Sequence, residues 1–173
     1  MIRLTIFLLA IVLNQSCRQV NPLQNNSEMN TKNPHEVIEK DHIFGVQHTE
    51  EEWKQQLDEP AFQILRNKAT ERPFSSPIEH LLDTGNYMCA GCGAVLFKSH
   101  QKFDSGCGWP SFFDAANKQA IVTAVDNSHG MQRIEIMCAK CGGHLGHLFD
   151  DGPSEKGGLR YCVNGKSLQF KQQ

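Results

Sequence analysis

Six of the seven cysteines in this chain lie between Cys89 and Cys162, and four of the six form two CxxC pairs. The pairs are Cys89-x-x-Cys92 and Cys138-x-x-Cys141, and a glycine follows each of them. Two thiolates at this spacing can coordinate one metal ion, and the glycine permits the tight turn that this coordination requires. Four thiolates without a further ligand are typical of a closed, structural zinc site. The pattern therefore predicts one structural Zn²⁺ held by both pairs.

Two other interpretations of the CxxC pairs remain open. In an exported protein each pair could form a disulfide, and a CxxC pair can also act as a redox-active dithiol. Two matched pairs in one chain favour the metal site over both. The 45 residues between the pairs exceed a usual zinc-ribbon spacing, so we expect the inserted segment to carry another function.

The cysteine at position 162 is the first candidate for catalysis. It lies in a short run, 159–163, that predicts a strand, and alternation would place Arg160, Cys162 and Asn164 on one face. A cation close to the sulfur favours the thiolate, which is the nucleophilic form. A lone strand cysteine is more often inert core packing. The polar neighbours on the same face favour a reactive thiol here.

A second thiol and two histidines extend this candidate site. Cys107 lies between Gly106 and Gly108 in a loop, where we expect a mobile and accessible thiol able to resolve an oxidised partner. A loop cysteine in isolation would more often be incidental. His144 and His147 directly follow the second CxxC pair in a run with three glycines. One such histidine would more often belong to the core, but two predict a rigidly held polar pocket.

Three short helices are expected to precede the strands that hold these residues. Thr49 and Glu52 form a capping box for the first helix. Pro60 suits the first turn of the second. Ser76 repeats the capping pattern for a third, which Gly85 would end.

After position 85 the hydrophobic period changes to that of strands. Short β-branched or alternating runs occupy 94–97, 120–125, 133–137 and 159–163. Residues 126–130 (DNSHG) predict the turn of a hairpin between two of these runs. The globular part is therefore expected to be mainly β, with short helices at its amino end. No Gly-rich phosphate loop follows a strand, so nucleotide binding has no support.

The overall composition fits one globular domain with accessory segments. Of 173 residues, 39% are hydrophobic and 21% are charged, which allows a packed core. The net charge of −2 gives no basic field, so we expect no nucleic-acid partner.

The amino end is typical of an export signal. A basic start and an apolar stretch of about ten residues are too short to span a bilayer but fit a signal-peptide core. Ser16-Cys17 resembles a lipoprotein processing site, so Cys17 is expected to be lipidated; a plain cleaved signal is the alternative. We therefore assign 1–17 to a signal peptide, 18–47 to a flexible linker and 48–173 to the globular domain. The expected location is the periplasm or a membrane to which the lipid anchors the chain.

Three longer motifs carry a family resemblance. Residues 102–112 (KFDSGCGWPSF), 142–149 (GGHLGHLF) and 160–164 (RYCVN) closely resemble the B-class peptide-methionine (R)-S-oxide reductases. The similarity runs from about residue 48 to residue 170, which is nearly all of the globular part. It implies a mainly β fold of two antiparallel sheets, arranged like a tent, with short amino-terminal helices and a structural zinc site.

The resemblance also implies a role for each candidate residue. Cys162 matches the nucleophile, Cys107 a resolving position and Trp109 the wall of the pocket for the substrate methyl group. The polar shell around sulfoxide and nucleophile is matched by His144, His147, Asp151, Arg160 and Asn164. The zinc ligands are matched by Cys89, Cys92, Cys138 and Cys141.

The implied activity is reduction of the R epimer of methionine sulfoxide in oxidised proteins. Cys162 would attack the sulfur, the histidines would supply a proton, and the sulfenic acid formed would condense with Cys107 to a disulfide. A thioredoxin-like protein is the expected reductant, and the chain is expected to act as a monomer. A zinc-ribbon binding module would leave Arg160 and the histidine pair unexplained. A general thiol–disulfide oxidoreductase would lack its usual βαβ context.

Overall fold

The computed structural model describes residues 33–38 and 41–173, which form two α-helices followed by nine strands. The α-helices are α2 (Glu50–Gln56) and α3 (Glu59–Asn67). The strands are β1 (Gly85–Cys89), β2 (Val95–Lys98), β3 (Lys102–Phe103), β4 (Ser111–Phe112), β5 (Ile121–Asp126), β6 (Arg133–Cys138), β7 (His144–Phe149), β8 (Arg160–Val163) and β9 (Leu168–Gln172). Short 3-10 helices are η1 (Ser99–Gln101), η2 (Ser128–Gly130), η3 (Ser154–Lys156) and η4 (Gly165–Ser167).

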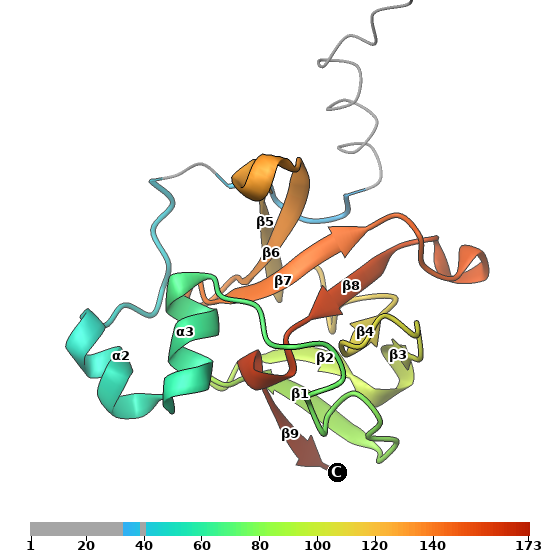
Figure 1. The fold of residues 1–173 in the computed structure, drawn as a ribbon, viewed down its shortest axis with the longest axis horizontal. Coiled ribbons are helices and arrows are strands. Elements are labelled where there is room, and N and C mark those ends of the chain that lie inside the picture. The colour runs from blue at the N-terminus through green and yellow to red at the C-terminus, as the bar shows by residue number, and fades with distance from the viewer. Residues whose placement is uncertain (1–32, 39–40) are drawn as a thin grey trace, which may run out of the picture. The chain divides into compact units, whose positions relative to one another are not determined.

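The strands form two antiparallel sheets (Figure 1). One has three strands in the order β2-β1-β9, and the other has six in the order β3-β4-β8-β7-β6-β5. The predicted fold class, mainly β with two antiparallel sheets and short helices before them, is confirmed. The hairpin predicted around 126–130 is also present, as β5 pairs antiparallel with β6 across η2.

Aromatic side chains from both sheets form the core between them. Phe97 of β2 stacks on Phe112 of β4 with ring centroids 4.2 Å apart, and Tyr87 of β1 meets Phe112 edge-on at 5.0 Å. Tyr161 of β8 contacts Phe97 and is fully buried. Because side chains alternate along a strand, the burial of Tyr161 turns its neighbour Cys162 to the opposite face of β8.

The first two predicted helices are present with the expected caps. The Thr49 hydroxyl accepts from the Glu52 amide, and the Glu52 carboxylate accepts from the Thr49 amide. Asp58 caps α3 by accepting from the Ala61 amide, and Pro60 lies in its first turn. These helices hold the loops of the two CxxC pairs, as described below.

The prediction of a third helix between Ser76 and Gly85 is wrong. Residues 77–80 form turns, and the Ser76 hydroxyl accepts from the Ile78 amide two residues on rather than capping a continuing helix. Leu82 is 93% exposed, so a helix here would have no apolar face to bury. Gly85 instead begins β1, where its missing side chain admits Lys171 and Phe170 of β9.

Residues 33–38 lie along β5. Val37 forms a parallel bridge with Thr123, the Ile38 amide donates to the Thr123 carbonyl (2.8 Å), and Asn33 Nδ2 donates to the Thr123 hydroxyl (2.8 Å). His35 is only 7% exposed and its Nε2 hydrogen-bonds the Tyr161 hydroxyl at 2.7 Å. This part of the expected 18–47 linker therefore packs on the domain.

The expectations for the signal peptide 1–17, for lipidation of Cys17 and for linker residues 18–32 concern positions outside the described residues. Among the described residues, none of the helices is long and apolar enough to cross a bilayer.

Candidate active site and metal centre

The two thiols outside the CxxC pairs lie side by side. The Sγ atoms of Cys107 and Cys162 are 3.9 Å apart. Strand pairing explains the approach, because Ser111 of β4 is the register partner of Cys162 and the loop before β4 carries Cys107. Gly106 and Gly108 both have positive φ (68° and 90°), which lets this loop fold back over β8.

The Cys107 sulfur is held rather than free in its loop. Ser105 Oγ donates to it at 3.0 Å, and Ser111 Oγ lies 3.6 Å away. Burial works to raise the pKa of the Cys107 thiol, but these hydroxyls lower it below its ordinary value. Cys107 is half-buried, which leaves its sulfur accessible as expected, and its mobility stays a prediction.

The arginine on the cysteine face approaches the other sulfur. Arg160 Nη1 donates to Cys107 Sγ at 3.5 Å, while its Nε and Nη2 donate to the two carboxylate oxygens of Asp151 at 2.7 and 2.9 Å. The guanidinium also covers the Phe149 ring, 4.4 Å from its centroid. Asp151 thus fixes the cation beside the two thiols.

The two thiols differ in how readily they ionise. Burial raises the pKa of the Cys162 thiol to about 12, and the charge of Cys107 adds to this rise while Arg160 opposes it. Of the two thiols, Cys107 is therefore the one that ionises more readily. The sequence predicts that Arg160 favours the Cys162 thiolate. Its charge does lower the pKa of Cys162, but burial raises that pKa by more.

Both histidines are bound to carboxylates that sequence reasoning missed. His144 Nδ1 hydrogen-bonds Glu135 Oε1 at 2.8 Å, and His147 Nε2 hydrogen-bonds Asp126 Oδ2 at 2.7 Å. The ring centroids of the two histidines are 5.5 Å apart. Lys68 Nζ donates to the other oxygen of Glu135 at 2.7 Å. In the sequence, the one sign of these carboxylates is the acidic residue within the largely apolar run 133–137.

His147 is the histidine that shares a cavity with the nucleophile candidate. In the register of β7 and β8 it lies opposite Cys162. Both line a cavity of about 130 Å³. The lining residues are Thr70, Trp109, Arg133, Gly146, His147, Phe149, Cys162, Val163 and Asn164. A small cavity with an aromatic wall, a thiol and an imidazole can hold a short polar-tipped aliphatic group.

Glu71, a loop residue that the sequence analysis did not predict to be part of the site, binds two of the side chains that line this cavity. The Glu71 carbonyl accepts from Trp109 Nε1 at 3.1 Å, and the Glu71 amide donates to Asn164 Oδ1 at 3.0 Å. The Glu71 carboxylate in turn accepts from the amides of Gly165 and Lys166. Trp109 and Asn164 are thus fixed on either side of the cavity by one backbone position.

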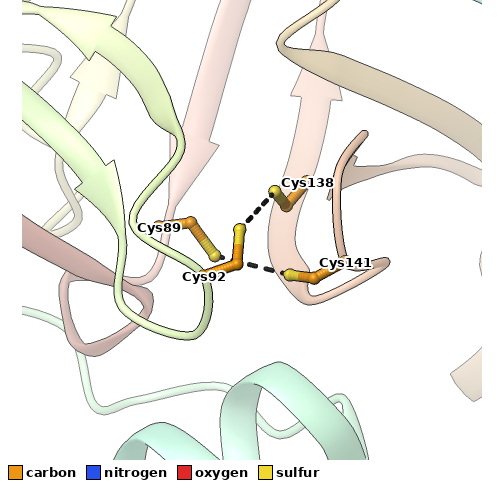
Figure 2. Close-up of side chains that lie close together, drawn as sticks. All are labelled: Cys89, Cys92, Cys138 and Cys141. Atoms are coloured by element: carbon orange, nitrogen blue, oxygen red, sulfur yellow. Dashed lines mark hydrogen bonds between the residues drawn. The ribbon is translucent and has the colours of Figure 1, made fainter. Parts of the chain in front are cut away.

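The four remaining cysteines form one cluster (Figure 2). Cys89 ends β1 and Cys92 lies in the loop that leads to β2, while Cys138 ends β6 and Cys141 lies in the loop that leads to β7. All four sulfurs lie within 4.8 Å of one another. Gly93 and Gly142 both have φ of 70°, the tight turn that the sequence predicted.

The sulfur spacing between the two pairs fits a tetrahedral metal, and all four cysteines are free of disulfides. The distance is 3.7 Å from Cys89 to Cys141 and 3.5 Å from Cys92 to Cys138. Four ligands at ~2.3 Å from zinc would lie ~3.8 Å apart, whereas bonded sulfurs lie ~2.05 Å apart. The cluster is therefore compatible with a zinc site.

The cluster joins the two sheets and is braced by the helices. One loop belongs to the three-stranded sheet and the other to the six-stranded sheet. Gln56 Nε2 donates to the Gly91 carbonyl, and Arg66 Nη1 donates to the Cys141 carbonyl. A metal here would tie β6 and β7, and hence both histidines, to the rest of the domain.

The chain is similar in sequence to known proteins. The SelR domain family matches residues 57–172. A peptide methionine sulfoxide reductase MsrB of Bradyrhizobium diazoefficiens is 54% identical over 123 residues, 71% of this chain and 88% of that protein. The protein of that name from Leptospira interrogans is 48% identical over 130 residues, 75% of this chain and 98% of its own.

A third relative of the same name, from Variovorax paradoxus, is 53% identical over 132 residues, 73% of this chain and 96% of that protein. The SelR match includes both CxxC pairs, Cys107, Cys162 and every residue that lines the cavity. The chain is therefore a member of the SelR-domain family, that of the MsrB peptide methionine sulfoxide reductases.

Proposed function

We propose that this protein reduces the R epimer of methionine sulfoxide in oxidised proteins. The observation that carries the proposal is the placement of Cys162, with Cys107 3.9 Å away, at a cavity shared with Trp109 and His147. The Trp109 ring would receive the methyl and methylene groups of the substrate. A chiral sulfoxide held this way presents its sulfur to Cys162 in one epimer only.

In the first step the Cys162 thiolate attacks the sulfoxide sulfur and takes over its oxygen. The sulfur–oxygen bond of the substrate breaks, one proton is taken up, methionine leaves and Cys162 becomes a sulfenic acid. His147, opposite Cys162 and at the same cavity, delivers the proton directly or through water. The Arg160 charge lowers the pKa of Cys162 against the effect of burial and so favours the attacking thiolate.

The second step returns the enzyme toward its starting state. The Cys107 sulfur attacks the sulfenic acid, a Cys107–Cys162 disulfide forms and water leaves. An external dithiol protein of the thioredoxin type then reduces the disulfide and becomes oxidised itself. Both steps use groups that already lie together, and neither requires an organic cofactor.

Zinc is proposed as a structural cofactor, one ion per chain. Cys89, Cys92, Cys138 and Cys141 would supply all four ligands and leave no open position for a substrate. The ion would therefore act on stability and on the position of β7.

We further propose that the chain is exported and acts as a monomer in the periplasm or at a membrane. The apolar stretch before Cys17 and the serine at position 16 support export with lipid attachment at Cys17. The net charge of −2 does not favour nucleic acid as a partner.

The test is an epimer-resolved reduction assay with a peptide methionine sulfoxide and a dithiol. We expect the R epimer to be consumed and the S epimer to remain. Cys162→Ser should abolish the reaction, because a serine hydroxyl cannot store the oxidation. Equal consumption of both epimers, or turnover by Cys162→Ser, would contradict the proposal.

A further inference from the structure

Asp126, at the carboxyl end of β5, joins three groups at the edge of the cavity. Its Oδ2 accepts from His147 Nε2 at 2.7 Å and from Arg133 Nη2 at 2.8 Å. Its Oδ1 accepts from the Ser128 amide at 2.9 Å, which begins the turn between β5 and β6. Arg133 is the register partner of Asp126 across the hairpin. Arg133 and the Ser128 amide thus fix the carboxylate, and the carboxylate fixes the histidine.

This contact determines which nitrogen of His147 carries the proton. A carboxylate only accepts hydrogen bonds, so the neutral ring must carry its hydrogen on Nε2, facing Asp126. Nδ1 is then the nitrogen left for a ligand in the cavity that His147 shares with Cys162. A carboxylate that orients an imidazole in this way sets both its tautomer and its basicity.

We propose that Asp126 is a positioning residue for the sulfoxide reduction, which fixes His147 with Nδ1 toward the substrate, and that Arg133 holds Asp126 in place. The inference rests on the proposed function for its consequence in catalysis. Its structural part, the tautomer of His147, stands independently of that function.

The charges around His147 agree with this role. Partial burial works to raise the pKa of Asp126, but hydrogen bonds from Ser128 and His147 and the Arg133 charge hold it well below its usual range. Burial lowers the pKa of His147, and the carboxylate of Asp126 opposes that fall. The ring is therefore neutral at rest beside an anion that stabilises its protonated form when a proton passes through it.

The other polar groups packed around His147 cannot replace Asp126. Glu135 lies opposite His147 in the β6–β7 register, but its carboxylate is engaged by His144 and Lys68. The His144 and Arg133 charges both work to lower the pKa of His147. Asp126 is thus the anion in direct contact with this ring among the described residues.

The experiment uses Asp126→Asn in the full chain, because asparagine keeps the shape but can donate as well as accept. In wild type, ¹⁵N shifts of the His147 ring should report the Nε2–H tautomer, and in the variant both tautomers should appear. The maximal rate of a single turnover on the R epimer should fall by roughly 10- to 100-fold, with little change in the substrate concentration that gives half of that rate. In the pH dependence of that rate, the apparent pKa that belongs to His147 should fall by ~1 pH unit, because the anion that raised the His147 pKa is gone.

Val125→Ala is the matched control. It shortens an exposed side chain next to Asp126 and lowers the strand propensity of the same hairpin, yet it leaves the contact between Asp126 and His147. A purely structural role for Asp126 predicts similar losses in both variants, whereas we expect Val125→Ala to keep the single-turnover rate within about twofold.

Two results would overturn the inference. One is an Nδ1–H tautomer in wild type, which needs no variant and does not depend on activity. The other is a folded Asp126→Asn variant with an unchanged tautomer, pH profile and rate. Failure of wild type to reduce the R epimer would instead count against the proposed function and would leave the tautomer result readable.

Discussion

The sulfurs of Cys107 and Cys162 lie 3.9 Å apart as free thiols, about 2 Å beyond the length of a disulfide bond. A small movement of the loop between β3 and β4 would close that gap. A side chain at Gly106 would meet no other atom within 4 Å, so the loop has room on that side. Ser105 and Arg160 hold the Cys107 sulfur only through hydrogen bonds, which would break when the loop moves.

Replacing Cys107 by serine should separate the two halves of the cycle. Cys107→Ser should still reduce about one equivalent of R-sulfoxide per enzyme, since the first step uses Cys162 and its surroundings only. Multiple turnover with a thioredoxin-like protein should collapse, because such a partner acts on a disulfide. A small dithiol should restore much of the rate by attacking the sulfenic acid. Undiminished turnover with the protein reductant would remove Cys107 from the cycle.

The ionisation of Cys162 should respond in opposite directions to its two charged neighbours. Its pKa is raised to about 12, firstly by burial and then by the charge of Cys107, while Arg160 lowers it. In Cys107→Ser the pKa should therefore fall, so the thiolate forms at lower pH. In Cys107→Ser with Arg160→Ala it should rise again, by about one pH unit.

Alkylation rates of Cys162 against pH measure this pKa, with the same Cys107→Ser background in both proteins. If the two variants gave superimposable profiles, Arg160 would have no electrostatic effect on the thiol.

Loss of one zinc ligand should destabilise the whole domain. Cys138→Ser should purify with less than one zinc per chain and unfold about 10 °C or more below wild type, because binding energy at a structural site is folding energy. Metal analysis and thermal unfolding of the same preparation test this. Ser128→Ala, in the hairpin but outside the cluster, serves as the control. A zinc-free wild type of equal stability with a disulfide in each CxxC pair would contradict the metal site.

Docking of residues 33–38 on β5 should weaken in acid. Burial lowers the pKa of His35 below 6.5, so the folded state prefers the neutral ring. The unfolded state then binds more protons below pH ~6.5, and the stability that the docked ring contributes is present above that pH and lost as the pH falls. His35→Gln, which cannot titrate, should lack this dependence.

Hydrogen exchange at the Ile38 amide, which donates to Thr123, reports the docking directly. Loss of the bond between His35 and Tyr161 should cost about 1 kcal/mol. The same pH dependence of exchange in wild type and His35→Gln would show that another group controls the segment.

Local patterns predicted much of this fold because they depend on neighbours in the sequence. Alternation in 159–163 predicted one shared face for Arg160, Cys162 and Asn164; Cys162 and Asn164 do line one cavity, while Tyr161 between them in sequence is buried in the core. The capping box at Thr49 predicted α2, yet the same pattern at Ser76 failed. The difference lies in burial, since α2 seats Trp53 in the core whereas Leu82 points to solvent.

The parts of the site that sequence reasoning missed depend on strand register and loop packing. Asp126 meets His147 only because β5, β6 and β7 pair in one order. Lys68 and Glu135 are 67 positions apart, and Glu71 and Asn164 are 93 apart. Such contacts leave no periodic signal in one sequence. The sequence could name the reactive residue types, but not Asp126 and Glu135, the carboxylates that orient the histidines.

The most direct test of the proposed cycle is a single turnover without reductant, followed by mass-spectrometric mapping of every cysteine. With one equivalent of R-sulfoxide, the account predicts one methionine per enzyme and a disulfide between Cys107 and Cys162, with the four clustered cysteines unchanged. Methionine formed while Cys107 and Cys162 both remain thiols, or a disulfide that involves the CxxC pairs instead, would contradict it.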